Sequence, residues 1–229
     1  MSEEETTQVE NPREERGSPI PGCLILSAIV IVFGGLVVLY TFVGIYQNRT
    51  IGEFTQDIAA VVSIEAPTGT ETAAVTAKLL AIEAAVKANR AERFFFTARD
   101  LNIMIATLDV AKDFRGNTMV EKIGSEGLVA PMAQPLRKGI FDKGKRYLNA
   151  TFLLEPELRA RTIAFKVRDI RPAVGTVPQG FIDNYSVIDF FRLDPENPAI
   201  KANVKSLGGI YIENDQLVVE TQIREDNAE

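Results

Sequence analysis

The longest uninterrupted run of apolar residues lies near the N-terminus, from Cys23 to Tyr46, and no charged residue occurs between Arg16 and Arg49. A helix rises about 1.5 Å per residue, so this run can cross a hydrocarbon core about 30 Å thick. A core helix of a soluble protein usually has a polar face, which this run lacks. The pattern therefore predicts a single-pass transmembrane helix over residues 19–47.

A cleaved signal peptide is the main alternative to a transmembrane helix. Its apolar core would have about 7–15 residues, between a basic start and a small-residue cleavage site. Here the run is longer, the preceding tail is acidic, and Gln47-Asn48-Arg49 does not resemble such a site. We therefore expect an uncleaved signal-anchor.

The basic residues that flank the span predict its orientation. Arg13 and Arg16 precede it, whereas Arg49 alone follows it closely. Cytoplasmic flanks carry an excess of Lys and Arg, so we expect the tail in the cytoplasm. The C-terminal domain is then extracytoplasmic, either periplasmic or extracellular.

The rest of the chain divides into three parts. Residues 1–18 are polar and Glu-rich, which predicts a disordered acidic tail. Residues 48–67 are predicted to be a stalk, in which Phe54, Ile58 and Val61 fall on one face of a juxtamembrane helix ending before Pro67. Residues 68–229 are predicted to form one domain, large enough for its own core.

Two helices are predicted at the start of this domain. Thr68 and Glu71 have the spacing of a capping box. Thr97 is expected to cap the second helix, with Asp100 at its third position. Asn102 lies off the apolar face of that helix and is expected on the surface. The apolar face has helical spacing and consists of Leu101, Met104, Ile105 and Leu108.

From Thr118 onward apolar and polar residues tend to alternate, which predicts half-buried antiparallel strands. A break is expected at Glu155-Pro156-Glu157, and a hairpin turn at Asn214-Asp215. Strands are predicted over 93–97, 118–123, 128–132, 146–154, 158–171, 209–213 and 216–223, and further helices over 177–192 and 197–207. The fold class is therefore α+β, an N-terminal transmembrane helix followed by one domain with helices packed on a curved antiparallel sheet.

Charge and composition exclude several classes of function. The first 16 residues contain six Glu and two Arg, so the remaining 25 acidic and 23 basic residues leave the domain nearly neutral. Nucleic-acid-binding proteins usually carry a basic surface, so no nucleic acid is expected as a partner. The chain has no His, which excludes the common catalytic triads and His-ligated zinc.

No cofactor, metal ion or catalytic residue is predicted. Asp183, Asp189, Asp194 and Glu196 match no calcium-loop spacing, and no phosphate-binding Gly loop occurs. Carboxylate chemistry or a Ser–Lys pair stays possible without His, but no spacing marks either. We therefore expect a protein that is not an enzyme.

Three short motifs follow the anchor in order: Phe94-Phe-Phe-Thr-Ala-Arg-Asp-Leu-Asn102, Lys145-Arg-Tyr-Leu-Asn149 and Val177-Pro-Gln-Gly-Phe181. They resemble the YpmS-type family of single-pass bacterial envelope proteins, whose function is unassigned. The resemblance covers residues 90–223 and implies a leading helix on a curved antiparallel sheet. A more distant likeness to helix-on-sheet lipid-binding domains implies an apolar groove.

Two functions are predicted, and an enzyme is the third and least favoured. The first is a membrane-anchored accessory or scaffold protein of the cell envelope, non-catalytic, with an envelope protein as its partner. The alternative is a domain that binds lipid or another apolar ligand at the membrane surface, with membrane lipid as its partner. The ligand-binding residues expected for this alternative are Phe94, Phe96, Met104, Phe152 and Phe165.

Overall fold

The structure is a computed structural model of the chain, and it describes residues 20–137, 144–159, 162–187, 191–192, 196, 198 and 204–223. The predicted acidic tail, most of the helix predicted over 197–207, and both Asp189 and Asp194 lie outside these residues. The chain forms two compact units, Met1–Tyr46 and Gln47–Glu229.

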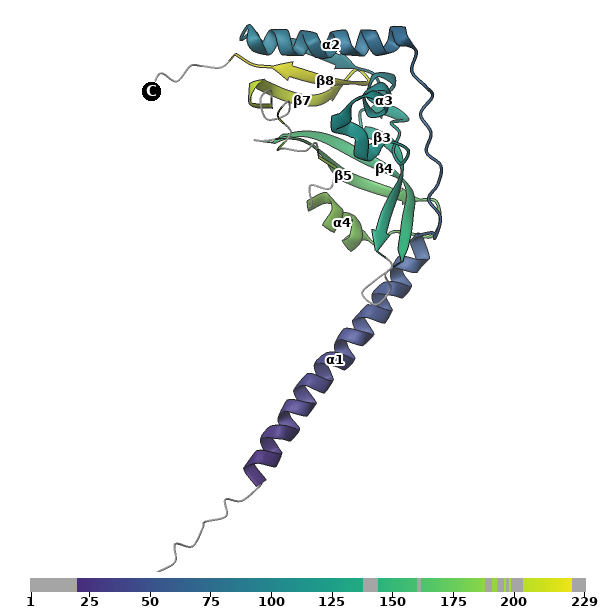
Figure 1. The fold of residues 1–229 in the computed structure, drawn as a ribbon, viewed down its shortest axis with the longest axis vertical. Coiled ribbons are helices and arrows are strands. Elements are labelled where there is room, and N and C mark those ends of the chain that lie inside the picture. Colours follow the sequence, from purple (N-terminus) through teal and green to yellow (C-terminus); the bar gives the residue numbers. More distant parts are fainter. Residues whose placement is uncertain are drawn as a thin grey trace, which may run out of the picture. The chain divides into compact units, whose positions relative to one another are not determined.

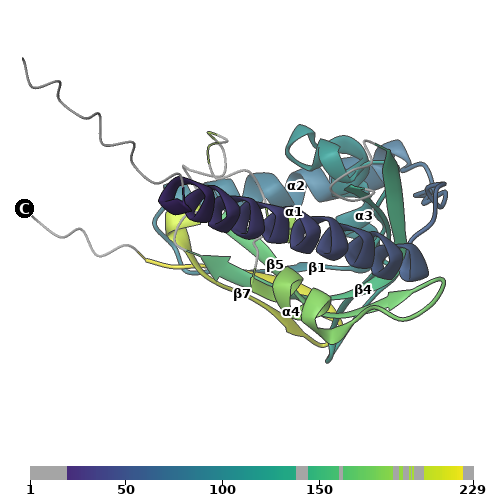
Figure 2. The ribbon, with the colours of Figure 1, turned by 90° about the horizontal axis from the view of Figure 1, so that it is seen from below.

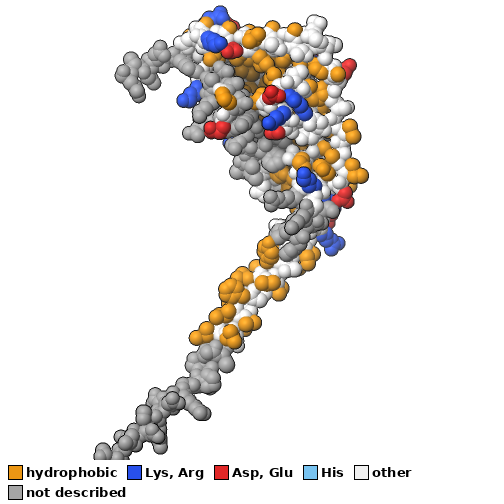
Figure 3. All heavy atoms as spheres, in the orientation of Figure 1, with side chains coloured by type: hydrophobic (Ala, Val, Ile, Leu, Met, Phe, Trp, Pro, Cys, Tyr) orange, Lys and Arg blue, Asp and Glu red, His pale blue; other side chains and the backbone are white. Residues whose placement is uncertain are grey.

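The predicted span is a single helix, α1 (Ile20–Phe54). Its segment Leu24–Phe54, 31 residues long, is long and apolar enough to cross a membrane, and none of its most apolar window is buried inside the protein. Hydrophobic side chains cover the part of this helix that Figure 3 shows. The core helix of a soluble domain buries its apolar face, whereas the most apolar stretch of α1 is unburied. These properties are consistent with a membrane anchor.

The helix predicted for the stalk is wrong beyond Phe54. Residues 55–68 form no helix, and the side chains of Ile58 and Val61 are 80% and 92% exposed. The backbone of this segment bonds instead to a distant strand, where Gln56 and Tyr147 exchange two hydrogen bonds of 2.9 and 2.7 Å. Those partners, about 90 residues away in sequence, are not visible in helical periodicity.

The second unit is α+β, as the sequence predicts (Figure 1). Its helices are α2 (Gly69–Lys87), α3 (Ala98–Thr107) and α4 (Gln179–Val187), with short 3-10 helices η1 (Asp109–Phe114) and η2 (Val204–Ser206). Its strands are β1 (Arg93–Phe96), β2 (Lys122–Gly124), β3 (Gly127–Arg137), β4 (Lys145–Arg159), β5 (Thr162–Pro172), β6 (Phe191–Arg192), β7 (Leu207–Glu213) and β8 (Gln216–Thr221).

The strands divide between two antiparallel sheets, where the prediction named one. One sheet has the order β1-β8-β7, and the other has the order β2-β3-β4-β5-β6. Helix α2 lies along the smaller sheet, and α4 lies against β5 of the larger one (Figures 1 and 2). The β7–β8 turn at Asn214 and Asp215 has φ angles of 51° and 58°, which fits the predicted two-residue hairpin.

Two predicted boundaries in the larger sheet are wrong. Strand β4 runs through Pro156 instead of ending at Leu154, and Pro156 pairs with Phe165 of β5. The ladder with β3 ends at the Leu128–Leu154 pair, so Pro156 lies where β4 has only one neighbour, a position that tolerates proline. The helix predicted to Arg192 also stops early, because residues 191–192 form β6 and pair with β5.

The hydrophobic core lies entirely within the second unit. Both sheets contribute to it, and its largest fully buried side chains include Phe96 of β1 and Phe152 of β4. The first core residue along the chain is Phe54, and the partly buried Ile51 packs against the core. Residues 47–229 thus contain all the described side chains that build this core.

The last turns of α1 are part of this core. Phe54 packs edge-on against Phe181 of α4, with ring centroids 5.1 Å apart. The Arg146 guanidinium donates hydrogen bonds to the hydroxyl and the carbonyl of Thr55, each 2.7 Å long. Carbonyl groups at the C-terminal end of a helix lack hydrogen-bond donors within the helix, and Arg146 supplies a donor to one of them.

Candidate functional site

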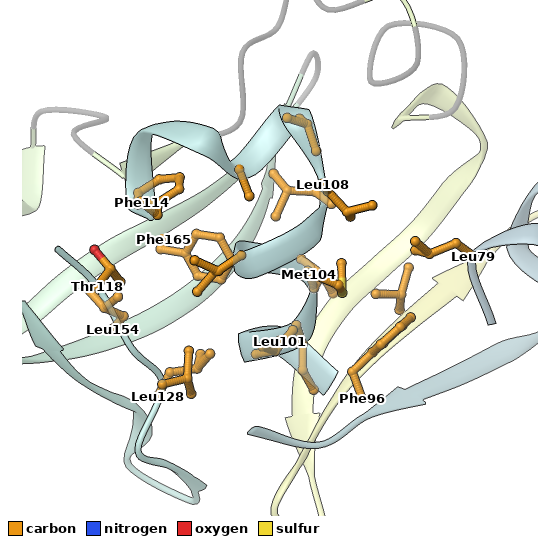
Figure 4. Close-up of a pocket in the computed structure, with 18 of the residues that line it drawn as sticks. Leu79, Phe96, Leu101, Met104, Leu108, Phe114, Thr118, Leu128, Leu154 and Phe165 are labelled. Atoms are coloured by element: carbon orange, nitrogen blue, oxygen red, sulfur yellow. The ribbon is translucent and has the colours of Figure 1, made fainter. Parts of the chain in front are cut away.

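A cavity of about 440 Å³ lies within the second unit. It lies between the two sheets, and α2, α3 and η1 also contribute to its wall (Figure 4). Pockets that hold small molecules have volumes of about 300–1,000 Å³. The cavity is therefore large enough for a small ligand.

The wall of the cavity is almost wholly apolar. Of the 24 described residues that line it, Glu83 and Thr118 alone have polar side chains. The apolar ones are Leu79, Ile82, Phe96, Leu101, Met104, Ile105, Leu108, Val110, Ala111, Phe114, Val120, Leu128, Ala130, Met132, Leu154, Ile163, Phe165, Val204, Leu207, Ile210, Leu217 and Val219. Such a wall suits an apolar ligand, because little of it offers hydrogen bonds.

The apolar face predicted for α3 forms one wall of this cavity. Leu101, Met104, Ile105 and Leu108 all line it, and each is only partly buried. The most buried residues of α3 are instead Asn102 and Ile103. Leu101, Met104 and Ile105 also pack against the hydrophobic core, so this face of α3 contributes both to the core and to the cavity wall.

Asn102 holds α3 in this position, and its predicted place on the surface is wrong. Its side chain is 9% exposed. The amide donates to the carbonyl of Val120 and accepts from the Val120 N–H, both at 2.8 Å. A buried backbone needs such partners because water cannot reach it, so Asn102 fixes α3 to the segment before β2.

The predicted caps at Thr68 and Thr97 fix the starts of both helices. Thr68 accepts from the Glu71 N–H and Glu71 accepts from the Thr68 N–H, as predicted. The Thr97 hydroxyl also accepts from the Asp100 N–H, and the Asp100 carboxylate accepts from the Thr97 N–H at 2.8 Å. The two helices that line the cavity therefore start at defined residues.

Ion pairs between residues outside the cavity wall connect the two helices. Arg99 of α3 bonds the Glu71 carboxylate at 2.8 and 2.9 Å. Lys78 of α2 bonds the Asp100 carboxylate at 2.8 Å, and its ammonium lies 5.5 Å from the ring centroid of Phe96. Because each helix supplies one cation and one anion, the pairs fix the position of α2 relative to α3.

The five ligand-binding residues predicted from the sequence separate into two groups. Phe96, Met104 and Phe165 line the cavity from three different elements (Figure 4). Phe152 is 0% exposed and belongs to the hydrophobic core, while the partly buried Phe94 packs against that core, and neither lines the cavity. Binding of a ligand by the first three stays a prediction.

Several lining residues were missed by the sequence analysis. Leu79 and Ile82 lie one turn apart on α2, and Glu83 follows directly. Leu217 and Val219 come from β8, which pairs with β1 and so brings the C-terminal hairpin beside Phe96. Spacing along α2 carries a signal for the first group. The second group depends on a pairing between strands about 120 residues apart, which local patterns do not reveal.

Glu83 is the one ionisable side chain among the described residues of the cavity wall. It is 45% exposed, and its carboxylate lies 2.7 Å from the Lys87 ammonium on the next turn of α2. The carboxylates with lowered pKa values, Glu71 and Asp100, belong to the helix caps and lie outside the wall. The cavity thus has an apolar interior and one charged side chain at its edge.

Comparison with protein-family models, curated proteins and solved structures finds no match to this chain. The resemblance to the YpmS-type family therefore stays a prediction. Among the described residues, no group of three or more Cys, Asp or Glu side chains is placed to hold a metal ion.

Proposed function

We propose that this protein is a membrane-anchored, lipid-binding protein whose second unit takes up the apolar chain of a single amphiphile. The observation that carries this proposal is the cavity of about 440 Å³ with an almost wholly apolar wall. Each buried methylene of a ligand contributes about 0.8 kcal/mol. A chain of moderate length would therefore bind by its apolar contacts alone.

The N-terminal helix supports the same function. A membrane anchor holds the binding domain close to the lipid surface, which raises the effective concentration of lipid without any new contact. In this proposal the domain lies outside the cytoplasm, because Arg13 and Arg16 are expected to keep the N-terminal flank inside. Its ligand is then a lipid component of the cell envelope.

The accessory or scaffold function predicted from the sequence is the second candidate. One observation favours it. Ile58 and Val61, on the segment between α1 and α2, are 80% and 92% exposed, and an exposed apolar side chain can contact a partner protein. Two exposed side chains carry this candidate, whereas 22 apolar residues line the cavity, so lipid binding is the better supported proposal.

Native mass spectrometry of residues 47–229, purified without detergent, tests the proposed function. These residues contain the whole described core, so we expect them to fold without the apolar part of α1. The protein should carry a bound lipid or take up an added monoacylglycerol. Met104→Trp replaces a flexible side chain of the cavity wall with a bulky indole ring, which should fill part of the cavity and weaken lipid binding. Leu80→Trp, at the 58% exposed Leu80 outside the wall, should leave lipid binding unchanged.

A folded domain that carries no lipid and takes up none would contradict this function. The scaffold function would then be the remaining candidate. Circular dichroism of both tryptophan variants provides the control for folding.

A further inference from the structure

The polar groups of the cavity wall lie at different places around an apolar interior. Thr118 lies across the cavity from Leu79 in Figure 4, and Glu83 is one helical turn beyond Leu79 on α2. Thr118 is 5% exposed, and its hydroxyl already donates to the Asn117 side chain at 2.8 Å. The partly exposed Glu83 is therefore the group best placed to meet the polar end of a bound amphiphile.

A carboxylate accepts hydrogen bonds and donates none. A ligand head that donates, such as a hydroxyl or an amide, can bond to Glu83. A carboxylate or phosphate head offers only acceptor oxygens and the same sign of charge, so Glu83 would repel it.

The nearby cations do not reverse this preference. Lys78 is outside the wall, and its ammonium is bound by the Asp100 carboxylate and the Phe95 carbonyl at 2.8 and 3.0 Å. Lys87 also lies outside the wall and is 72% exposed. Neither Lys nor Arg occurs among the described residues that line the cavity.

We propose that the cavity selects amphiphiles with an uncharged, hydrogen-bond-donating head over anionic ones, and that Glu83 determines this specificity. The proposal rests on the proposed function, because it assigns the chemical class of the ligand in the same cavity. A monoacylglycerol has such a head, and a fatty acid of the same chain length has the anionic one.

Competition between two probes with the same chain tests this specificity. Monolauroylglycerol and laurate, each below its micelle concentration, would displace the neutral dye phenylnaphthylamine from residues 47–229 at mildly alkaline pH. The decisive quantity is the ratio of the two affinities, compared between the wild type and Glu83→Lys. We expect the preference for monolauroylglycerol to fall by roughly tenfold in Glu83→Lys.

Two further variants should change the ratio in opposite directions. Glu83→Gln removes the negative charge and should reduce the preference for monolauroylglycerol. Lys87→Gln removes the cation that partly neutralises Glu83 and should increase it. Glu126→Gln, in the exposed β2–β3 turn and outside the wall, is the matched control and should leave the ratio unchanged.

The possible outcomes separate this inference from the proposed function. If both probes displace the dye and the ratio is the same in wild type and Glu83→Lys, the specificity assigned to Glu83 is overturned and lipid binding stands. If laurate is preferred in the wild type, the inference is also overturned. If neither probe nor dye binds a folded protein, the proposed function itself fails.

Discussion

Arg99 of α3 binds Glu71, the residue that completes the capping box of α2. Its Nε and Nη2 atoms lie 2.8 and 2.9 Å from the two carboxylate oxygens of Glu71. The opposite arrangement occurs where Lys78 of α2 binds Asp100, the residue that completes the capping box of α3. Each helix therefore depends on a cation of the other to support its start, and both helices line the cavity.

This arrangement predicts a loss of stability in acid. Hydrogen bonds from Arg99, then from the backbone and hydroxyl of Thr68, lower the pKa of Glu71 from its ordinary value of 4.5 to about 2. Burial raises the pKa of Asp100, but hydrogen bonds from Lys78 and Thr97 outweigh it and lower the pKa overall. A lowered pKa means that the folded state favours the ionised form, so its stabilisation is complete above the ordinary pKa and disappears as the pH falls through the lowered one.

Thermal unfolding of residues 47–229 measures this effect. The melting temperature should fall as the pH is lowered from about 4.5 toward about 2, and Glu71→Gln should make the fall less steep. Glu65→Gln is the control, because the Glu65 side chain is 88% exposed and lies 3.8 Å from Arg99. An equal fall of the melting temperature in the wild type and in Glu71→Gln would show that the Arg99–Glu71 pair does not contribute to stability.

Replacement of Asn102 should lower the free energy of unfolding more than is usual for a small polar residue. Asn102→Ala removes the partners of the Val120 N–H and carbonyl, and each unsatisfied buried group costs about 1–3 kcal/mol. Asn184→Ala, at an exposed position of α4, should change the free energy of unfolding by less than about 0.5 kcal/mol. Urea unfolding monitored by circular dichroism compares the two, and similar effects would contradict the role assigned to Asn102.

Asn102 also shows where local sequence patterns are insufficient. The capping box at Thr68 and the helix cap at Thr97 were predicted correctly, because the partner of each residue lies three positions away. The partner of Asn102 lies 18 residues away, so its amide resembled a surface group. Predictions from spacing succeed where the deciding contact is local.

The cavity could not be predicted for a related reason. Periodicity identified the apolar face of α3 and the alternation in β4 and β5, and the α+β fold class followed from them. Apolar spacing shows which side chains avoid water, but it does not show whether neighbouring elements fill the space between them. Phe152 and Phe165 had the same pattern, yet one is packed in the core and the other lines the cavity.

Gly175 should be sensitive to any side chain. It has a φ of +71°, and a Cβ atom there would lie 2.2 Å from the carbonyl oxygen of Glu53 at the end of α1. Gly116 has a similar φ of +76° but nothing within 4 Å of the same position. Gly116→Ala should therefore cost about 1–2 kcal/mol for backbone strain alone, and Gly175→Ala should cost more.

The difference in stability between the two glycine variants measures the effect of the close approach between residue 175 and the Glu53 carbonyl. Thermal unfolding of both proteins provides the measurement. If Gly175→Ala is no more destabilised than Gly116→Ala, the loop after β5 does not pack closely against the end of α1.

The orientation in the membrane gives a further prediction. Arg13 and Arg16 should remain in the cytoplasm, with the second unit on the other side. Fusions of alkaline phosphatase and of green fluorescent protein after Glu229 report opposite sides in a bacterial host. We expect an active phosphatase and a dark fluorescent protein, and the reverse pattern would contradict the predicted orientation.

Quenching of a single tryptophan by a brominated lipid tests the central claim, that the cavity holds an apolar chain. The chain contains no Trp, so each variant has one reporter. Leu79→Trp places it in the cavity wall, and Leu80→Trp places it on the adjacent, 58% exposed position. A dibrominated monoacylglycerol should quench the first and leave the second nearly unchanged in residues 47–229. Equal quenching of both, or quenching of neither, in folded proteins would contradict the claim.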